Sequence, residues 1–165
     1  MQTLNLTPAQ LNHLKQHGSL WVWMVMKEQP IEVGDSLAMP IRGIAARGYR
    51  PFRESDYPFR LGERVEYAVP KNGWKNDDNG LTCSPTVVFE TEYATLTTSP
   101  EPRRLDSITE EEAEAAGTTP VVVDTDTGYG DMRLFAGAFK CEMLETHPDL
   151  TPSSYGWWFQ IEKEN

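Results

Sequence analysis

Hydrophobic and polar positions near the start of the chain predict a short helix followed by a strand. Thr7-Pro8-Ala9-Gln10 offers an N-cap with proline at the first helical position, so a helix is expected that places Leu11 and Leu14 on one face and ends near Gly18. The next segment, Leu20 to Met26, is dense in β-formers and apolar at successive positions. This pattern predicts a strand that is buried on both faces.

The middle of the chain has a less regular pattern. Residues 34–62 combine glycine, proline and arginine with little periodicity, which predicts a long irregular excursion. Strands are predicted from Arg64 to Val69 and from Thr86 to Thr98, the second as one long strand or a bent pair. Between them, Pro70 to Pro85 contains two Asn-Gly pairs and is predicted to be a turn-rich insert.

The residues from Arg103 to Gly117 predict the end of a strand followed by a short helix that ends at the glycine. Thr109 and Glu112 form a capping box, in which each side chain accepts a hydrogen bond from the other residue's backbone N–H. Ile108 can pack against the first turn, and Gly117 supplies the left-handed residue that ends a helix.

The last third begins with Thr118 to Gly130, which is predicted to be a loop or hairpin. Asp131 is then predicted to cap a helix whose apolar side chains recur at helical spacing, namely Leu134, Phe135, Ala138, Phe139 and Met143. The total of about six strands and three helices suits a small closed or nearly closed barrel with covering helices.

The Arg103–Gly117 run resembles the signature of the ASCH family, the PUA-like β-barrel domains common in bacterial prophages. Its residues fit Arg-Leu-x-x-Ile-[Ser/Thr]-Glu-Glu-[Asp/Glu]-Ala-x-x-x-Gly. Three other segments resemble the family in the expected order: 26–30, 62–65 and the closing strand 156–162. The resemblance implies an α+β fold, a PUA-like small mixed β-barrel of about six strands with about three covering helices.

On this interpretation residues 1–165 form a single ASCH/PUA-like domain with insertions near 70–85 and 118–130. Family members that hydrolyse acylated cytidine nucleosides carry Gly-x-Lys-x-x-Thr-x-Arg after the first helix and a glutamate on a later strand. Counting from Gly18, the lysine and threonine positions hold Leu20 and Trp23, and the glutamate falls at about Val69. A nucleophile needs a hydroxyl or thiol and a base that activates it. We therefore predict no catalytic residues here and favour a protein that is not an enzyme.

Composition predicts a cytoplasmic protein, and the resemblance to a prophage family implies a bacterial host. No apolar run approaches the roughly 20 residues that span a bilayer, and the start lacks the features of a signal peptide. Cys83 and Cys141 are isolated, which indicates neither a zinc site nor a disulfide. His13 and His17 have a spacing that can bind metal, but a solvated pair is the simpler interpretation. We predict no metal, no cofactor and no membrane partner.

The net charge of −10 is unevenly distributed. Residues 42–64 hold six arginines and three acids, a balance of +3, whereas residues 101–165 hold fourteen acids and five bases, a balance of −9. Guanidinium groups and aromatic rings alternate in the basic segment, and such groups can follow phosphates and stack on bases. The predicted nucleic-acid-binding residues are Arg47, Tyr49, Arg50, Phe52, Arg53, Arg60 and Arg64. The competing interpretation is that the rings fix the loop to the barrel while the arginines pair with Glu54, Asp56 and neighbouring acids.

Two functions from different classes stay open. The first is a non-catalytic ASCH-like domain, encoded by a phage, that binds RNA, single-stranded nucleic acid or a modified nucleotide. The alternative is an acidic phage protein that binds and modulates a basic host protein, as a nucleic-acid mimic or anti-defence factor. A third possibility is a nucleoside amidohydrolase or ribonuclease with a relocated site.

Overall fold

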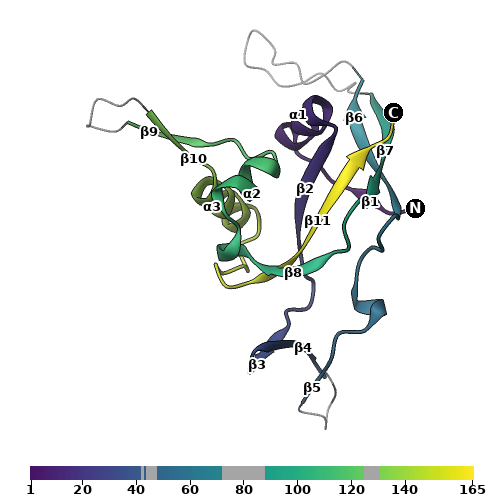
Figure 1. Ribbon diagram of the computed structural model, residues 1–165, viewed down its shortest axis with the longest axis vertical. Helices are drawn as coiled ribbons and strands as arrows, with labels where there is room; N and C mark the ends of the chain where they lie inside the picture. The colour runs from purple at the N-terminus through teal and green to yellow at the C-terminus, as the bar shows by residue number, and fades with distance from the viewer. Residues whose placement is uncertain (42, 44–47, 72–87, 125–130) are drawn as a thin grey trace.

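The computed structural model describes residues 1–41, 43, 48–71, 88–124 and 131–165. Its main sheet curls into a half-barrel (Figure 1). The six strands of this sheet are β1 (Thr3–Leu4), β2 (Ser19–Val25), β6 (Arg64–Pro70), β7 (Phe89–Leu96), β8 (Glu101–Arg104) and β11 (Tyr155–Lys163).

Strand β11 lies at the centre of the sheet. It pairs with β2 on one side, and on the other side with β8 near its start and β7 near its end. Strand β6 pairs with β7, and the parallel strand β1 completes the order β1-β6-β7-β11-β2. Because no pairing joins β1 to β2 among the described residues, the sheet is an open half-barrel and not the closed or nearly closed barrel that the pattern predicts.

Three α-helices accompany the sheet: α1 (Pro8–His17), α2 (Glu110–Ala115) and α3 (Ala136–Thr146). The start and end predicted for the first helix are confirmed, since Thr7 and Gln10 form a reciprocal capping box and Gly18 has a left-handed φ of 77°. The architecture is therefore a mixed α+β domain. Within the described part of the chain, no helix is long and apolar enough to cross a bilayer.

The sheet buries side chains on both of its faces. Alternate residues of β2 and β11, such as Leu20 and Phe159, join a core that also holds Leu14 of α1. The residues between them, such as Trp23 and Trp158, join a second core with α2 and α3. This confirms the prediction of a strand that is apolar on both faces.

The irregular excursion predicted for residues 34–62 is wrong in part. A small antiparallel sheet occupies this region, with the order β3 (Ile31–Val33), β4 (Ser36–Pro40) and β5 (Tyr49–Arg50), followed by a short 3₁₀ helix, η1 (Glu54–Asp56). Strands of two to five residues are too short to show a periodic pattern, and only pairing with their neighbours defines them. The insert predicted at 70–85 lies almost entirely outside the described residues.

The segment after α2 corrects a second prediction. The expected hairpin is present as β9 (Val121–Asp124) and β10 (Asp131–Leu134), which project from the body of the domain (Figure 1). Residues 131–134 therefore belong to a strand, and the helix predicted from Asp131 begins at Ala136. Pairing with β9 overrides the local helical spacing of Leu134.

Helix α3 has no local side-chain cap, and a carboxylate from α2 caps it instead. Glu110 accepts hydrogen bonds from the backbone N–H of Phe135 at 2.8 Å and of Ala136 at 3.0 Å. A carboxylate at a helix N-terminus satisfies unpaired amides and offsets the helix dipole.

We expect Glu110→Ala to lower the free energy of unfolding by about 1–2 kcal/mol, because α3 loses both of these hydrogen bonds. Equilibrium denaturation in urea measures the loss. Glu111→Ala is the matched control, since Glu111 is the next residue of the same first turn and is exposed. Equal losses in the two variants would contradict the cross-helix cap.

Candidate functional site

The predicted nucleic-acid-binding residues lie on the small sheet and on the chain that returns from it to β6. Arg47 lies outside the described residues. Tyr49 and Arg50 form β5, where Tyr49 is opposite Pro40 and 55% exposed. The remaining predicted residues lie between β5 and β6 or at the start of β6, namely Phe52, Arg53, Arg60 and Arg64.

Arg50 is held by a carboxylate of its own segment. Its two terminal nitrogens donate to the two oxygens of Asp56, both at 2.8 Å. Asp56 also accepts from the backbone N–H of Arg53 at 2.6 Å, which closes the η1 turn. The hydrogen bonds from Arg50 lower the pKa of Asp56 to about 2, with the Arg53 amide adding to the effect. The Arg50 guanidinium is thus fixed in place and largely neutralised.

Three aromatic rings of the segment, those of Phe52, Tyr57 and Phe59, pack against the main sheet. Phe52 meets the Trp157 ring edge-on with 5.8 Å between centroids, and Tyr57 lies 4.7 Å from the same ring. Phe59 is 3% exposed and packs on Phe159. Phe52 therefore fixes the loop to the half-barrel, as the competing interpretation expects.

The last two arginines lie apart from Arg50. Arg60 makes a 3.1 Å ion pair with Glu54, in which both side chains are 74% exposed. Arg64 donates to both carboxylate oxygens of Glu164 at 2.8 and 2.9 Å, and its guanidinium lies 3.8 Å from the centre of the Tyr93 ring. Arg64 thus binds the C-terminal end of the chain.

Among the described members of the predicted set, Tyr49 and Arg53 stay available for a ligand. Arg53 is exposed, and within the described residues its guanidinium makes no hydrogen bond or ion pair with a carboxylate. Both Arg50 and Arg53 line an open hollow of about 390 Å³, with Glu28, Pro40 and Ile41 on its other sides. The hollow therefore brings two guanidinium groups next to the strand that carries Tyr49.

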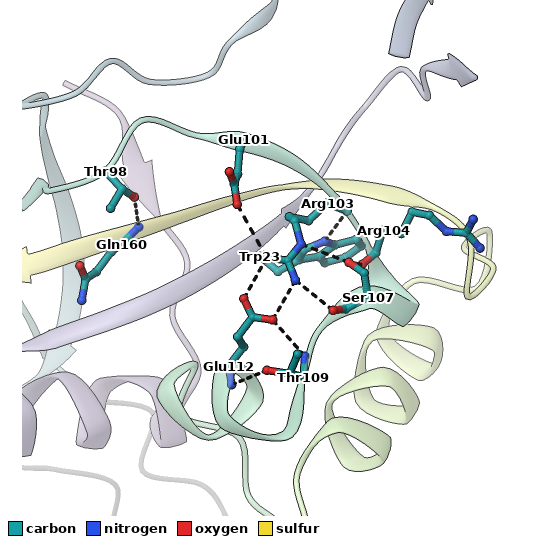
Figure 2. A network of polar contacts seen from close by, with 9 residues as sticks. All are labelled: Trp23, Thr98, Glu101, Arg103, Arg104, Ser107, Thr109, Glu112 and Gln160. Carbon is teal, nitrogen blue, oxygen red and sulfur yellow. Dashed lines mark hydrogen bonds and ion pairs between the residues drawn. The ribbon is translucent and has the colours of Figure 1, made fainter. Parts of the chain in front are cut away.

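The positions at which the ASCH resemblance would place catalytic residues hold bulky apolar side chains. Leu20 is fully buried and Trp23 is 4% exposed. The Trp23 indole extends across the neighbouring strand β11 and donates from Nε1 to the carbonyl oxygen of Arg103 at 3.0 Å (Figure 2). Val69 lies on β6, apolar like the other two.

The Arg103–Gly117 run has a structural use in this fold. Arg103 donates to both carboxylate oxygens of Glu112 at 2.8 Å and to the carbonyl oxygen of Ser107 at 2.9 Å (Figure 2). Its guanidinium also lies 5.7 Å from the ring centre of Trp158. The predicted Thr109–Glu112 capping box is confirmed, and Gly117 has the expected left-handed φ of 75°. The same glutamate thus caps α2 and joins it to β8.

The two histidines of α1 lie against each other. His13 and His17 lie with ring centroids 4.3 Å apart, and burial lowers the pKa of His13, with His17 adding to the effect. Among the described residues, no group of three or more histidine, cysteine or acidic side chains could hold a metal ion. Cys141 is an exposed free thiol, and Cys83 lies outside the described residues.

One further cleft is a feature that the sequence patterns did not predict. It has a volume of about 370 Å³ and lies between α1 and strands β6 and β7. Three lysines that are far apart in the sequence, Lys15, Lys71 and Lys163, line it. No local motif connects these positions, so periodicity and spacing could not have identified them.

No protein-family model, no curated protein and no solved structure matches the chain.

Proposed function

We propose that this protein is a non-catalytic ASCH-like domain, with a PUA-like half-barrel and a phage origin, that binds RNA, single-stranded nucleic acid or a modified nucleotide in its host's cytoplasm. The four segments that resemble the family support the assignment, as does an α+β fold with a curled sheet. The buried side chains of Leu20 and Trp23 favour binding over hydrolysis, because neither can act as a base or nucleophile.

The hollow beside β5 is the observation that carries the proposal. The Asp56 carboxylate holds the Arg50 guanidinium as a preformed planar surface, and guanidinium planes stack on unpaired bases. Arg53 adds a cation for a phosphate, and the exposed Tyr49 ring adds a second stacking surface. Together they offer a local site for a short single-stranded segment on a molecule whose net charge is −10.

The test measures the binding of a fluorescent single-stranded RNA by anisotropy over a range of salt concentrations. We expect Tyr49→Ala with Arg53→Ala to weaken binding by about tenfold, since a stacked base contributes about 1–3 kcal/mol. Arg53→Ala alone is expected to make the slope of log K against log salt shallower by about 0.7, the value for one phosphate of a single strand.

Arg133→Ala is the matched control, because Arg133 is an exposed arginine on the β9–β10 hairpin, outside the hollow. It removes the same charge from the whole molecule and is expected to leave the affinity nearly unchanged. Equal losses for Arg53→Ala and Arg133→Ala would show that net charge alone controls binding. Undiminished binding by the double variant would refute the proposed site.

A further inference from the structure

Apolar side chains form part of the wall of the cleft between α1 and strands β6 and β7. Leu14 and Tyr67, 1% and 2% exposed, belong to the main core and form part of its lining. Leu11 of α1 and Val69 of β6 add hydrocarbon walls. Its volume of about 370 Å³ falls in the range of small-molecule sites, about 300–1,000 Å³. The cleft can therefore take the apolar body of a small ligand.

Among the residues that the structure describes, the charged side chains lining the cleft have a balance of +1. The cations are Lys15, Lys71 and Lys163, and the anions are Glu90 and Glu92. Three of the six lysines in the chain thus lie at one cleft of a protein whose net charge is −10. This local excess of positive charge favours an anionic ligand.

Two of these charges are already satisfied by neighbours. Glu92 makes a 3.6 Å ion pair with Lys163 and accepts a hydrogen bond from the Tyr67 hydroxyl at 3.2 Å. Burial raises the pKa of Tyr67, so the hydroxyl keeps the proton that it donates to Glu92. Tyr67, Glu92 and Lys163 therefore satisfy one another, and together they offer little net charge to a ligand.

Lys15 and Lys71 are the cations left for a ligand. Lys15 lies in the last turn of α1, and Lys71 directly follows β6. Neither ammonium group makes an ion pair or side-chain hydrogen bond within the described part of the chain. The backbone N–H of Lys71 donates to the carbonyl oxygen of Val88 at 2.8 Å.

We propose that this cleft binds a small apolar carboxylate, with its hydrocarbon body against Leu11 and Val69 and its carboxylate between the ammonium groups of Lys15 and Lys71. A single negative charge matches the balance of +1, whereas a phosphate monoester carries about −1.5 to −2 at pH 7. A second negative charge would also approach Glu90, which lines the same cleft. The site is separate from the hollow beside β5, and it does not depend on the function proposed for that hollow.

The experiment is a titration of the full chain followed by NMR shifts of the backbone amides, with hexanoate as the probe. Hexanol lacks the charge, adipate adds a second carboxylate, and inorganic phosphate lacks the hydrocarbon. We expect hexanoate to bind at least about fivefold more tightly than each of the other three, with shifts at Lys15 and Lys71. Shifts that are absent, or no larger for hexanoate than for hexanol, would overturn the proposal.

Variants of the two lysines complete the test. Lys15→Ala and Lys71→Ala are each expected to weaken hexanoate binding by about fivefold and to leave hexanol binding unchanged. Lys27→Ala is the control, since Lys27 is exposed and lies outside the cleft. If Lys27→Ala weakened hexanoate binding as much as the cleft variants do, the effect would come from the loss of one positive charge anywhere on the protein. RNA binding by the lysine variants should stay at the wild-type level, so failure at one site can be told from failure at the other.

Discussion

Replacing Gly156 with alanine is expected to destabilise the fold by about 3 kcal/mol, the upper end of the usual cost of overpacking a core. Gly156 lies in β11, where the Trp23 indole passes directly over its backbone. An added Cβ would meet three atoms of that ring, among them Cζ2 at 2.6 Å and Cδ2 at 2.7 Å. The ring cannot move aside freely, because its Nε1 donates to the carbonyl oxygen of Arg103.

Equilibrium denaturation of the wild type and the variant measures this loss. Gly137→Ala is the control, because Gly137 lies in α3 with no atom within 4 Å of an added Cβ. That substitution is expected to stabilise the protein by about 0.5–1 kcal/mol, the usual advantage of alanine over glycine in a helix.

A double variant tests whether the tryptophan is the cause. In the background of Trp23→Leu, the same Gly156→Ala change should cost less than in the wild type, since the clashing ring is gone. Additive losses from the two substitutions would show that Gly156 is required for some reason other than the close approach of Trp23.

Replacing Arg103 with methionine is expected to lower the free energy of unfolding by about 2 kcal/mol. The hydrocarbon part of the side chain can still cover Trp158, but the carboxylate of Glu112 loses both of its charged hydrogen bonds. Removing one partner of a buried ion pair costs about 3–5 kcal/mol, and exposure of 23% for Arg103 and 27% for Glu112 reduces that figure.

Arg104→Met is the matched control for this variant. Arg104 also donates two hydrogen bonds to one carboxylate, that of Asp106, but the two side chains are 39% and 35% exposed. Water screens such a surface pair, so we expect a loss below about 1 kcal/mol. Comparable losses for the two arginine variants would contradict a special contribution from Arg103.

The stability of the protein should also depend on pH through the same pair. Hydrogen bonds from Arg103, with a further contribution from the Thr109 amide, lower the pKa of Glu112 to about 2 from an ordinary 4.5. A carboxyl whose pKa is lower in the folded state stabilises the fold above about pH 4.5 and loses this contribution as the pH falls toward about 2.

The wild type and Arg103→Met should therefore differ most in stability near neutral pH and converge in acid. Asp56 loses its own contribution in the same pH range, but it does so equally in both proteins because its partner is Arg50. Unfolding free energies measured from about pH 7 to about pH 3 test this. A constant difference across that range would show that Glu112 is not the titrating group.

Local signals in the sequence identified the elements whose ends are set by neighbouring residues. The two capping boxes, Thr7 with Gln10 and Thr109 with Glu112, lie within single turns of helix. The continuous apolar run of β2 likewise predicts a strand that is buried on both faces. These features need only contacts within a few residues, so they could be predicted before any tertiary structure was known.

The elements that the patterns missed depend on partners farther away. The local sequence of β10 predicts the start of a helix, but pairing with β9 makes this segment a strand. The cap of α3 comes from Glu110, which lies 25 residues before Phe135. Within the predicted nucleic-acid site, spacing could not show that Arg64 would bind Glu164, 100 residues later. An arginine's availability for a ligand depends on such pairings.

The sequence by itself thus determined where α1 and α2 begin and end, that β2 is apolar on both faces, and that Leu20 and Trp23 stand where the resemblance expects catalytic side chains. Only the tertiary structure decided that the sheet stays open, that Arg50 is neutralised while Arg53 stays available, and that Lys15, Lys71 and Lys163 meet at one cleft. The reason is the distance along the sequence over which each kind of interaction acts. Backbone hydrogen bonding and capping act over one turn or one strand, whereas packing and ion pairing join residues whose distance in the sequence has no bearing on their distance in space.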